Sequence, residues 1–124
     1  MTLEAIQEMK QAHRVLADYT YRVPTVQRGY ANQTLYVNLS DGHIESRPVT
    51  EEMKRIFIGG KGFGLWRLWH AVTPQTQWND PENELVIASG PIAGTALYPG
   101  TGKSLVVAIS PLTHIVVDSN VGGY

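Results

Sequence analysis

Apolar residues near the amino terminus recur at steps of three and four, with charged residues between them. This spacing is typical of an amphipathic helix with one apolar stripe. We therefore predict a helix over residues 1–20, followed by a linker over residues 21–29 that contains the helix-breaking Pro24. The positions on the stripe are Leu3, Ile6, Met9, His13 and Leu16.

The hydrophobic period changes to two at Gln33. Leu35, Val37 and Leu39 alternate with polar residues, and the turn Ser40-Asp41-Gly42 follows. A second extended stretch covers residues 43–48. Two extended runs joined by an Asp-Gly turn predict a β-hairpin.

Two short helices are expected next. Thr50 can cap the first, because its side chain accepts amide hydrogen bonds, and the acids at 51 and 52 favour the helix amino terminus. We expect this helix to end near Phe57, the glycine-rich stretch 59–64 to form a corner, and a second helix to cover residues 63–70. Leu65, Leu68 and Trp69 fall on one side of this helix. We expect the tryptophans to be core anchors: Trp66, Trp69 and Trp78.

Three further strands are predicted over residues 85–88, 104–109 and 114–119. A long loop rich in glycine and proline, residues 89–103, precedes the second of them. Strands and helices that are segregated along the chain indicate the α+β class. Residues 120–123 are expected to form a turn or bulge at the end of the last strand, or else a backbone that a bulky ligand approaches closely.

Composition excludes several classes of function. The 124 residues fit one domain or part of one, and 43% hydrophobic with 17% charged residues is typical of a packed core. A net charge of −1 argues against nucleic acid, and no apolar run approaches the roughly 20 residues that span a membrane. Cysteine is absent, which removes disulfides and cysteine-bound metal centres. With no visible secretory signal, we expect the chain in the cytoplasm.

Individual motifs leave alternatives open. Residues 100–104 share the Gly-Lys-Ser end of a phosphate-binding loop, but Leu97 stands where the first glycine belongs and a β run follows instead of a helix. This stretch is a glycine-rich turn, or it binds a phosphate through free amides and Lys103 in another geometry. The four histidines have no metal-ligand spacing and are expected to be surface or core residues.

Several short motifs occur in a particular order along the chain. They are Val37-Asn38-Leu39-Ser40-x-Gly42, Gly59-Gly60-Lys61-Gly62, Pro81-Glu82-Asn83-x-Leu85-Val86-Ile87-Ala88-Ser89-Gly90-Pro91-x-x-Gly94-Thr95, Gly102-Lys103, Ser110-Pro111-Leu112-Thr113 and Asn120-x-Gly122-Gly123-Tyr124. The order of these motifs resembles the N-terminal domain of the tungsten-containing aldehyde ferredoxin oxidoreductase family. The resemblance covers residues 29–124, and we expect residues 1–28 to form an additional N-terminal helix and linker.

The resemblance implies an α+β domain of two similar halves that forms the base for a bis-pterin cofactor of tungsten, or sometimes molybdenum. Complete members of the family oxidise aldehydes to carboxylic acids and pass electrons through a 4Fe-4S cluster to ferredoxin. By resemblance, Lys103 contacts the cofactor and Asn120 helps to hold a magnesium ion that bridges the pterin phosphates. Gly122 and Gly123 give room for the pterin.

The chain also departs from the family. The family usually has arginine at Lys103, and Asp118 and Ser119 stand where it is small or apolar. By resemblance, we expect this sequence to hold only the first half of the duplicated domain, and the cluster cysteines to lie in other parts of the family chain. We therefore expect this domain to be incomplete and inactive alone, with the rest of the enzyme or a larger subunit as partner.

Two alternatives remain at this point. The chain could be a stand-alone, non-catalytic or small-subunit module of the same fold that forms a homodimer or docks on a partner. It could also be a nucleotide-binding protein that uses residues 100–104.

Overall fold

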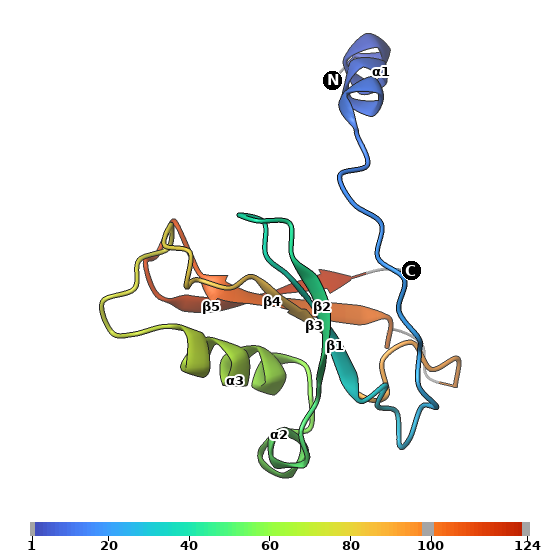
Figure 1. Ribbon diagram of the computed structural model, residues 1–124, viewed down its shortest axis with the longest axis vertical. Helices are drawn as coiled ribbons and strands as arrows, with labels where there is room; N and C mark the ends of the chain where they lie inside the picture. The colour runs from blue at the N-terminus through green and yellow to red at the C-terminus, as the bar shows by residue number, and fades with distance from the viewer. Residues whose placement is uncertain (1, 98–100, 123–124) are drawn as a thin grey trace.

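The computed structural model describes residues 2–97 and 101–122 (Figure 1). A β-hairpin, two helices and a three-stranded antiparallel sheet form the packed body, and the N-terminal helix stands apart from it. This arrangement confirms the predicted α+β class. The elements are α1 Leu3–Ala12, β1 Gln33–Val37, β2 Ile44–Pro48, α2 Glu51–Ile56, α3 Lys61–Ala71, β3 Val86–Ala88, β4 Lys103–Ile109 and β5 Val116–Gly122.

Helix α1 is shorter than the sequence pattern predicts. It begins at the Thr2 cap and ends at Ala12, where His13 takes an extended conformation with φ −68° and ψ 127°. The prediction that the helix continues to residue 20 is wrong. No residue of α1 is buried, so tertiary packing does not extend the helix, and isolated short helices are only marginally stable in water.

The hairpin prediction is confirmed. Strands β1 and β2 pair antiparallel from Gln33↔Pro48 to Val37↔Ile44. The backbone N–H of Asn38 donates to the carbonyl of His43 at 2.8 Å, and Gly42 adopts φ 73°, which suits glycine. The Asp-Gly turn therefore sets the register of the two strands.

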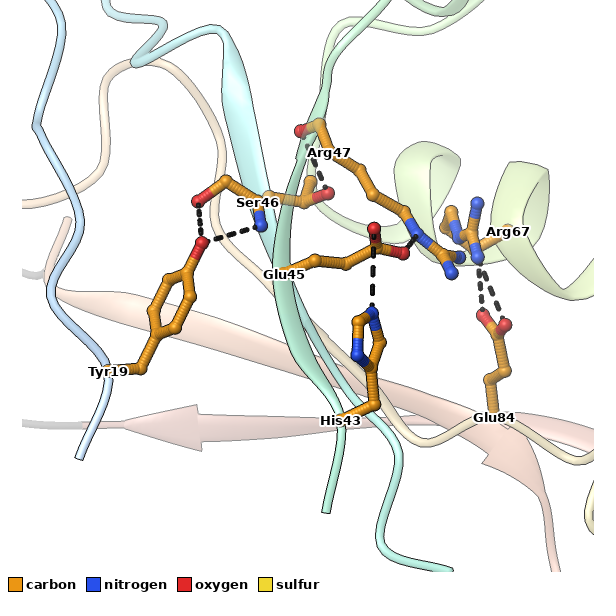
Figure 2. A network of polar contacts seen from close by, with 8 residues as sticks. Tyr19, His43, Glu45, Ser46, Arg47, Arg67 and Glu84 are labelled. Carbon is orange, nitrogen blue, oxygen red and sulfur yellow. Dashed lines mark hydrogen bonds and ion pairs between the residues drawn. The ribbon is translucent and has the colours of Figure 1, made fainter. Parts of the chain in front are cut away.

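Polar contacts tie the extended segment after α1 to this hairpin (Figure 2). The Tyr19 hydroxyl accepts a hydrogen bond from the backbone N–H of Ser46 at 3.1 Å. On the same strand, the Arg47 guanidinium donates to the Glu45 carboxylate at 2.6 Å, and His43 Nε2 lies 3.7 Å from that carboxylate. The hydrogen bond from Arg47 lowers the pKa of Glu45 below its ordinary value of 4.5.

Helix α3 covers one face of the sheet β3–β4–β5 (Figure 1). An added Cβ at Gly64 would lie 2.5 Å from Val107 Cγ2, so the helix backbone lies directly on the central strand. Leu68 is 2% exposed and Val107 is fully buried at this interface. The buried core consists of Met53, Phe63, Leu68, Val107 and Ile109.

The tryptophan prediction is wrong for Trp69, which is 82% exposed, and Trp78 is 43% exposed. Trp69 follows the buried Leu68 directly, and a step of about 100° around a helix carries it off the buried face. Trp66 is half-buried and contacts Phe57 edge-on, with ring centroids 6.5 Å apart.

Side-chain hydrogen bonds of Asn83 and Glu84 join the segment before β3 to α3 and to the end of β4. Arg67 of α3 donates to both carboxylate oxygens of Glu84, at 3.0 and 3.1 Å (Figure 2). The Asn83 amide accepts from the Ile109 N–H at 2.8 Å and donates to the carbonyls of Trp78 and Ile109. These bonds fix the sheet against α3 and close the end of β4.

Strand β5 extends further than predicted, because it pairs with β4 through residues 120–122. The expected turn or bulge at Asn120 does not form, and Asn120 and Gly122 are regular strand residues in the register Lys103↔Gly122 and Leu105↔Asn120. Among the described residues, no helix is long and apolar enough to cross a membrane.

The Glu45–Arg47 pair predicts a pH-dependent contribution to stability. A carboxyl group with a lowered folded pKa stabilises the fold above its unfolded pKa and loses that contribution as the pH falls through the folded pKa. We expect the difference in unfolding free energy between wild type and Glu45→Gln to be constant above about pH 5.5 and to shrink below about pH 4.5. Urea unfolding of both proteins across this pH range measures the difference in unfolding free energy. A difference at pH 3 as large as that at neutral pH would contradict the prediction.

The contact between Gly64 and Val107 predicts that Gly64→Ala destabilises the protein. Alanine in place of glycine favours an isolated helix by about 1 kcal/mol, whereas overpacking a core costs about 1–3 kcal/mol. Because the added Cβ would lie 2.5 Å from Val107, we expect Gly64→Ala to lower the free energy of unfolding, measured with urea. Gly90→Ala is the control, since its Cβ meets nothing within 4 Å in the described chain. A stabilised Gly64→Ala variant would contradict the packing.

Candidate functional site

Strand pairing brings the sequence-predicted site residues together at one end of the sheet. Lys103 begins β4 and lies opposite Gly122 of β5, and Leu105 lies opposite Asn120. Cross-strand partners project from the same face, about 4.5–5.5 Å apart at Cβ. Lys103, Asn120 and Gly122 therefore share one face, and all three are exposed to solvent. Gly123 lies outside the described residues.

This face is the one that α3 covers further along the sheet. Gly60, the N-cap of α3, lies against Leu105, since an added Cβ would be 3.3 Å from Leu105 Cδ1, while Gly64 lies against Val107. Leu105 and Val107 alternate with Lys103 on the same face of β4. Helix α3 thus runs along β4 with its amino terminus toward the start of that strand (Figure 1). That terminus carries a partial positive charge.

The predicted glycine corner is confirmed in front of α3. Gly59 adopts φ 148°, and Gly60 adopts φ 53° with ψ −123°, a conformation that only glycine takes without strain. The Gly60 N–H donates to the Ser89 carbonyl at 3.2 Å, and an added Cβ at Gly59 would lie 3.2 Å from Pro91 Cδ. The corner is therefore packed against the start of the glycine-rich loop after β3.

Open space borders the backbone around this end of the sheet. An added Cβ at Gly90, Gly94 or Gly122 would meet no atom of the described chain within 4 Å. Gly94 is held at φ 77°, and its N–H donates to the Thr101 carbonyl at 3.1 Å. The glycines of this region are thus of two kinds: those at the corner allow close packing, and these three leave the backbone accessible.

An ion pair that the sequence analysis did not anticipate lies on the same face. Lys61, the first residue of α3, places Nζ 2.5 Å from Oδ1 of Asp118. Asp118 precedes Asn120 by two residues on β5, so both project to the α3 side. A signal was present in the sequence, because a cation in the first turn of a helix opposes the usual preference for acids there.

The exposed groups at this end of the sheet are suited to binding an anion. This end offers an ammonium group, a helix amino terminus and accessible backbone, all of which favour an anionic group. Among residues 2–97 and 101–122, no three histidine or acidic side chains gather to hold a metal ion. Lys103 starts β4, which confirms the β run predicted after this loop, where a phosphate-binding loop would be followed by a helix.

A separate hollow of about 760 Å³ lies between the hairpin and β3. It contains none of the predicted site residues. Its lining includes exposed apolar side chains of the two sheets and the charged residues Arg47, Arg67 and Glu84. We do not place the candidate site there, because the groups that favour an anion converge at the other location.

Comparisons with known proteins agree with the resemblance. Residues 34–124 match the family model for the aldehyde ferredoxin oxidoreductase N-terminal domain. The chain is 40% identical over 96 residues to the tungsten-containing aldehyde ferredoxin oxidoreductase of Pyrococcus horikoshii, an alignment that covers 77% of this chain and 16% of that protein. It is 33% identical over 93 residues to an aliphatic sulfonate oxidoreductase, WOR-like subunit, of Pyrococcus furiosus, covering 73% and 14% of the two chains.

A solved structure shows the same fold. The active site complex BamBC of benzoyl coenzyme A reductase, in complex with 1,5-dienoyl-CoA, matches with a TM-score of 0.72 and 30% identity. The match covers 77% of this chain and 14% of that chain. The chain thus spans about 16% of the length of the curated relatives it matches.

The two kinds of glycine predict different responses to alanine. We expect Gly60→Ala to lower the free energy of unfolding by about 1–3 kcal/mol, because a side chain at φ 53° and ψ −123° is strained. Gly122→Ala is the matched control in an extended strand with open space beside it, and we expect a change within about 0.5 kcal/mol. If Gly60→Ala and Gly122→Ala lowered the free energy of urea unfolding equally, the division of these glycines into two kinds would be wrong.

Proposed function

The chain belongs to the aldehyde ferredoxin oxidoreductase family, and we propose that its packed body forms one side of the binding site for a tungsten–pterin cofactor in a larger oxidoreductase. The observation that carries the proposal is the pairing of Lys103 with Gly122, which brings the two predicted cofactor-binding segments onto one exposed face. Membership of this family supports an oxidoreductase and a tungsten-containing cofactor.

The residues of this face fit the proposed group. A pterin cofactor combines flat rings with anionic phosphates. The Lys103 ammonium and the amino terminus of α3 favour the anionic part. The open backbone at Gly90 and Gly122 leaves room for the flat part, because no described atom lies within 4 Å of the space a Cβ would fill. Gly123 is proposed to share that role.

The redox chemistry would be supplied by the bound cofactor. The residues of this chain would bind and orient it: Lys103 through charge, and Asn120 by helping to hold a magnesium ion near the phosphates. A 4Fe-4S cluster would need ligands from elsewhere, since this chain has no cysteine. Molybdenum in place of tungsten is a variant of the same proposal.

We further propose that the complete enzyme oxidises aldehydes to carboxylic acids and passes electrons to ferredoxin. The name of the relative from Pyrococcus horikoshii supports this reaction. The rest of the enzyme, as further sequence or as a larger subunit, would complete the cofactor site and provide the substrate cavity. This chain alone would be inactive.

A second candidate is a non-catalytic module or small subunit that forms a homodimer or docks on a partner. The sheet favours it, because the face opposite α3 carries apolar residues of which Ile87 is 66% and Val121 is 53% exposed. Val106, Ala108 and Val117 of the same face are half-buried. A partner would cover this surface in either proposal, so only cofactor content separates the two.

The test uses the enzyme purified from its native host with substitutions introduced on the chromosome. We expect tungsten or molybdenum and pterin in the wild type, measured by mass spectrometry of the metal and fluorescence of the oxidised pterin. Lys103→Gln removes the ammonium, and we expect it to retain about tenfold less cofactor, since a charge-assisted contact is worth about 1.5–3 kcal/mol. Lys103→Arg should retain at least as much as the wild type, because the guanidinium can bind two phosphate oxygens.

Lys10→Gln on α1 is the control for loss of a lysine away from the site. Its cofactor content should equal that of the wild type. A wild-type enzyme that contains neither metal nor pterin but copurifies with a partner or as a dimer would reject the first proposal and support the second. Equal cofactor content in Lys103→Gln and wild type would remove Lys103 from the site.

A further inference from the structure

We propose that Lys61 is a positioning residue of the cofactor site: by neutralising Asp118, it allows the anionic part of the cofactor to lie beside Asn120. The inference rests on the proposed function. The ion pair between Lys61 Nζ and Asp118 Oδ1, at 2.5 Å, is the observation that carries it.

Asp118 lies where a negative charge would act on the site. It shares the α3-side face of β5 with Asn120 and Gly122, and successive residues on one face are about 6.8 Å apart along a strand. Its side chain is 27% exposed, so water screens its charge only in part. An unpaired carboxylate at this position would repel phosphate groups held near Asn120 and Lys103.

Lys61 is placed to cancel that charge. It is the first residue of α3, after the Gly60 cap, and helical side chains tilt toward the amino terminus. Its ammonium reaches the carboxylate of Asp118, which lies opposite Val107 in the middle of the β4–β5 ladder. The Lys61 side chain is 55% exposed, so part of its surface remains accessible to solvent.

A role in stability alone gives a weak account of this lysine. Partly exposed ion pairs contribute little to folding, and a cation in the first turn of a helix is disfavoured by the helix dipole. Neutralisation of Asp118 by Lys61 accounts for the position of both residues. It also explains how the chain combines an acid beside Asn120 with a site for an anionic group.

A role in stability alone and neutralisation of Asp118 predict different effects of single substitutions on cofactor retention. If the pair only stabilises the fold, Lys61→Met and Asp118→Asn act in the same direction. If Lys61 offsets the charge of Asp118, Lys61→Met leaves a bare carboxylate that weakens cofactor retention. Asp118→Asn then leaves an uncompensated ammonium that strengthens it.

The experiment measures the rate at which pterin is released from the enzyme purified from its native host. Release is followed by fluorescence of the oxidised pterin. The variants are Lys61→Met, Lys61→Arg, Asp118→Asn and the double variant Lys61→Met with Asp118→Asn. The thermal unfolding midpoint of each cofactor-free protein is measured alongside, to separate lost folding from lost charge balance.

We expect release about tenfold faster in Lys61→Met, as for one uncompensated charge near a dianion in partly screened surroundings. Asp118→Asn should release pterin more slowly than the wild type, and Lys61→Arg should match the wild type. The double variant should return to within about twofold of the wild type, since both charges are absent. The unfolding midpoints of the two single variants should differ little from that of the wild type.

Release as fast in Asp118→Asn as in Lys61→Met would overturn the inference, as would a wild-type rate in Lys61→Met. If the Lys61→Met enzyme does not assemble, the Asp118→Asn variant alone tests the inference. Pterin release from Asp118→Asn that is no slower than from the wild type would then overturn it. Absence of pterin from the wild-type enzyme would instead reject the proposed function itself. The two failures are therefore distinguishable.

Discussion

The close contact between Gly64 of α3 and Val107 of β4 is the constraint on which the arrangement of the site depends. A side chain at position 64 would separate helix and strand, because its Cβ would lie 2.5 Å from Val107. The contact lets α3 lie along β4 and bury Phe63 and Leu68. The direction of the helix follows from it, and with that direction the amino terminus of α3 faces the end of the sheet that carries Lys103.

Burial also determines which side chains reach the site. Val107 and Ile109 must face α3 to be buried, and this requirement sets the face of every alternate residue on β4, including Lys103. Through the antiparallel register, Asp118, Asn120 and Gly122 of β5 face the same side of the sheet as these β4 residues. A slip of one residue would turn the whole set to the opposite face. The hydrophobic core and the candidate site are therefore set by one register.

The sequence allowed the local elements to be predicted and left the long-range ones uncertain. The hairpin turn at Asp41-Gly42 and the Thr50 cap depend on residues within a few positions, so their patterns were sufficient. The exposure of Trp69 and the extension of β5 through Gly122 depend on which surfaces meet in the folded chain, and α1 ends early because none of its residues is buried. For the site, the family resemblance pointed to Lys103 and Asn120, whereas the Lys61–Asp118 pair required the structure, because it joins residues 57 positions apart.

The exposed position of the candidate site limits what this chain can contribute to a reaction. Lys103, Asn120 and Gly122 lie on an open strand end, and water has free access to that surface. Redox enzymes need their reacting centre in a dry, shaped cavity, because water weakens the electrostatic control of the site and admits side reactions. Under the proposed function, this exposed face would supply one wall of such a cavity. Anchoring of the anionic groups would then reside in this chain, while the exclusion of water and the choice of substrate would come from the rest of the enzyme.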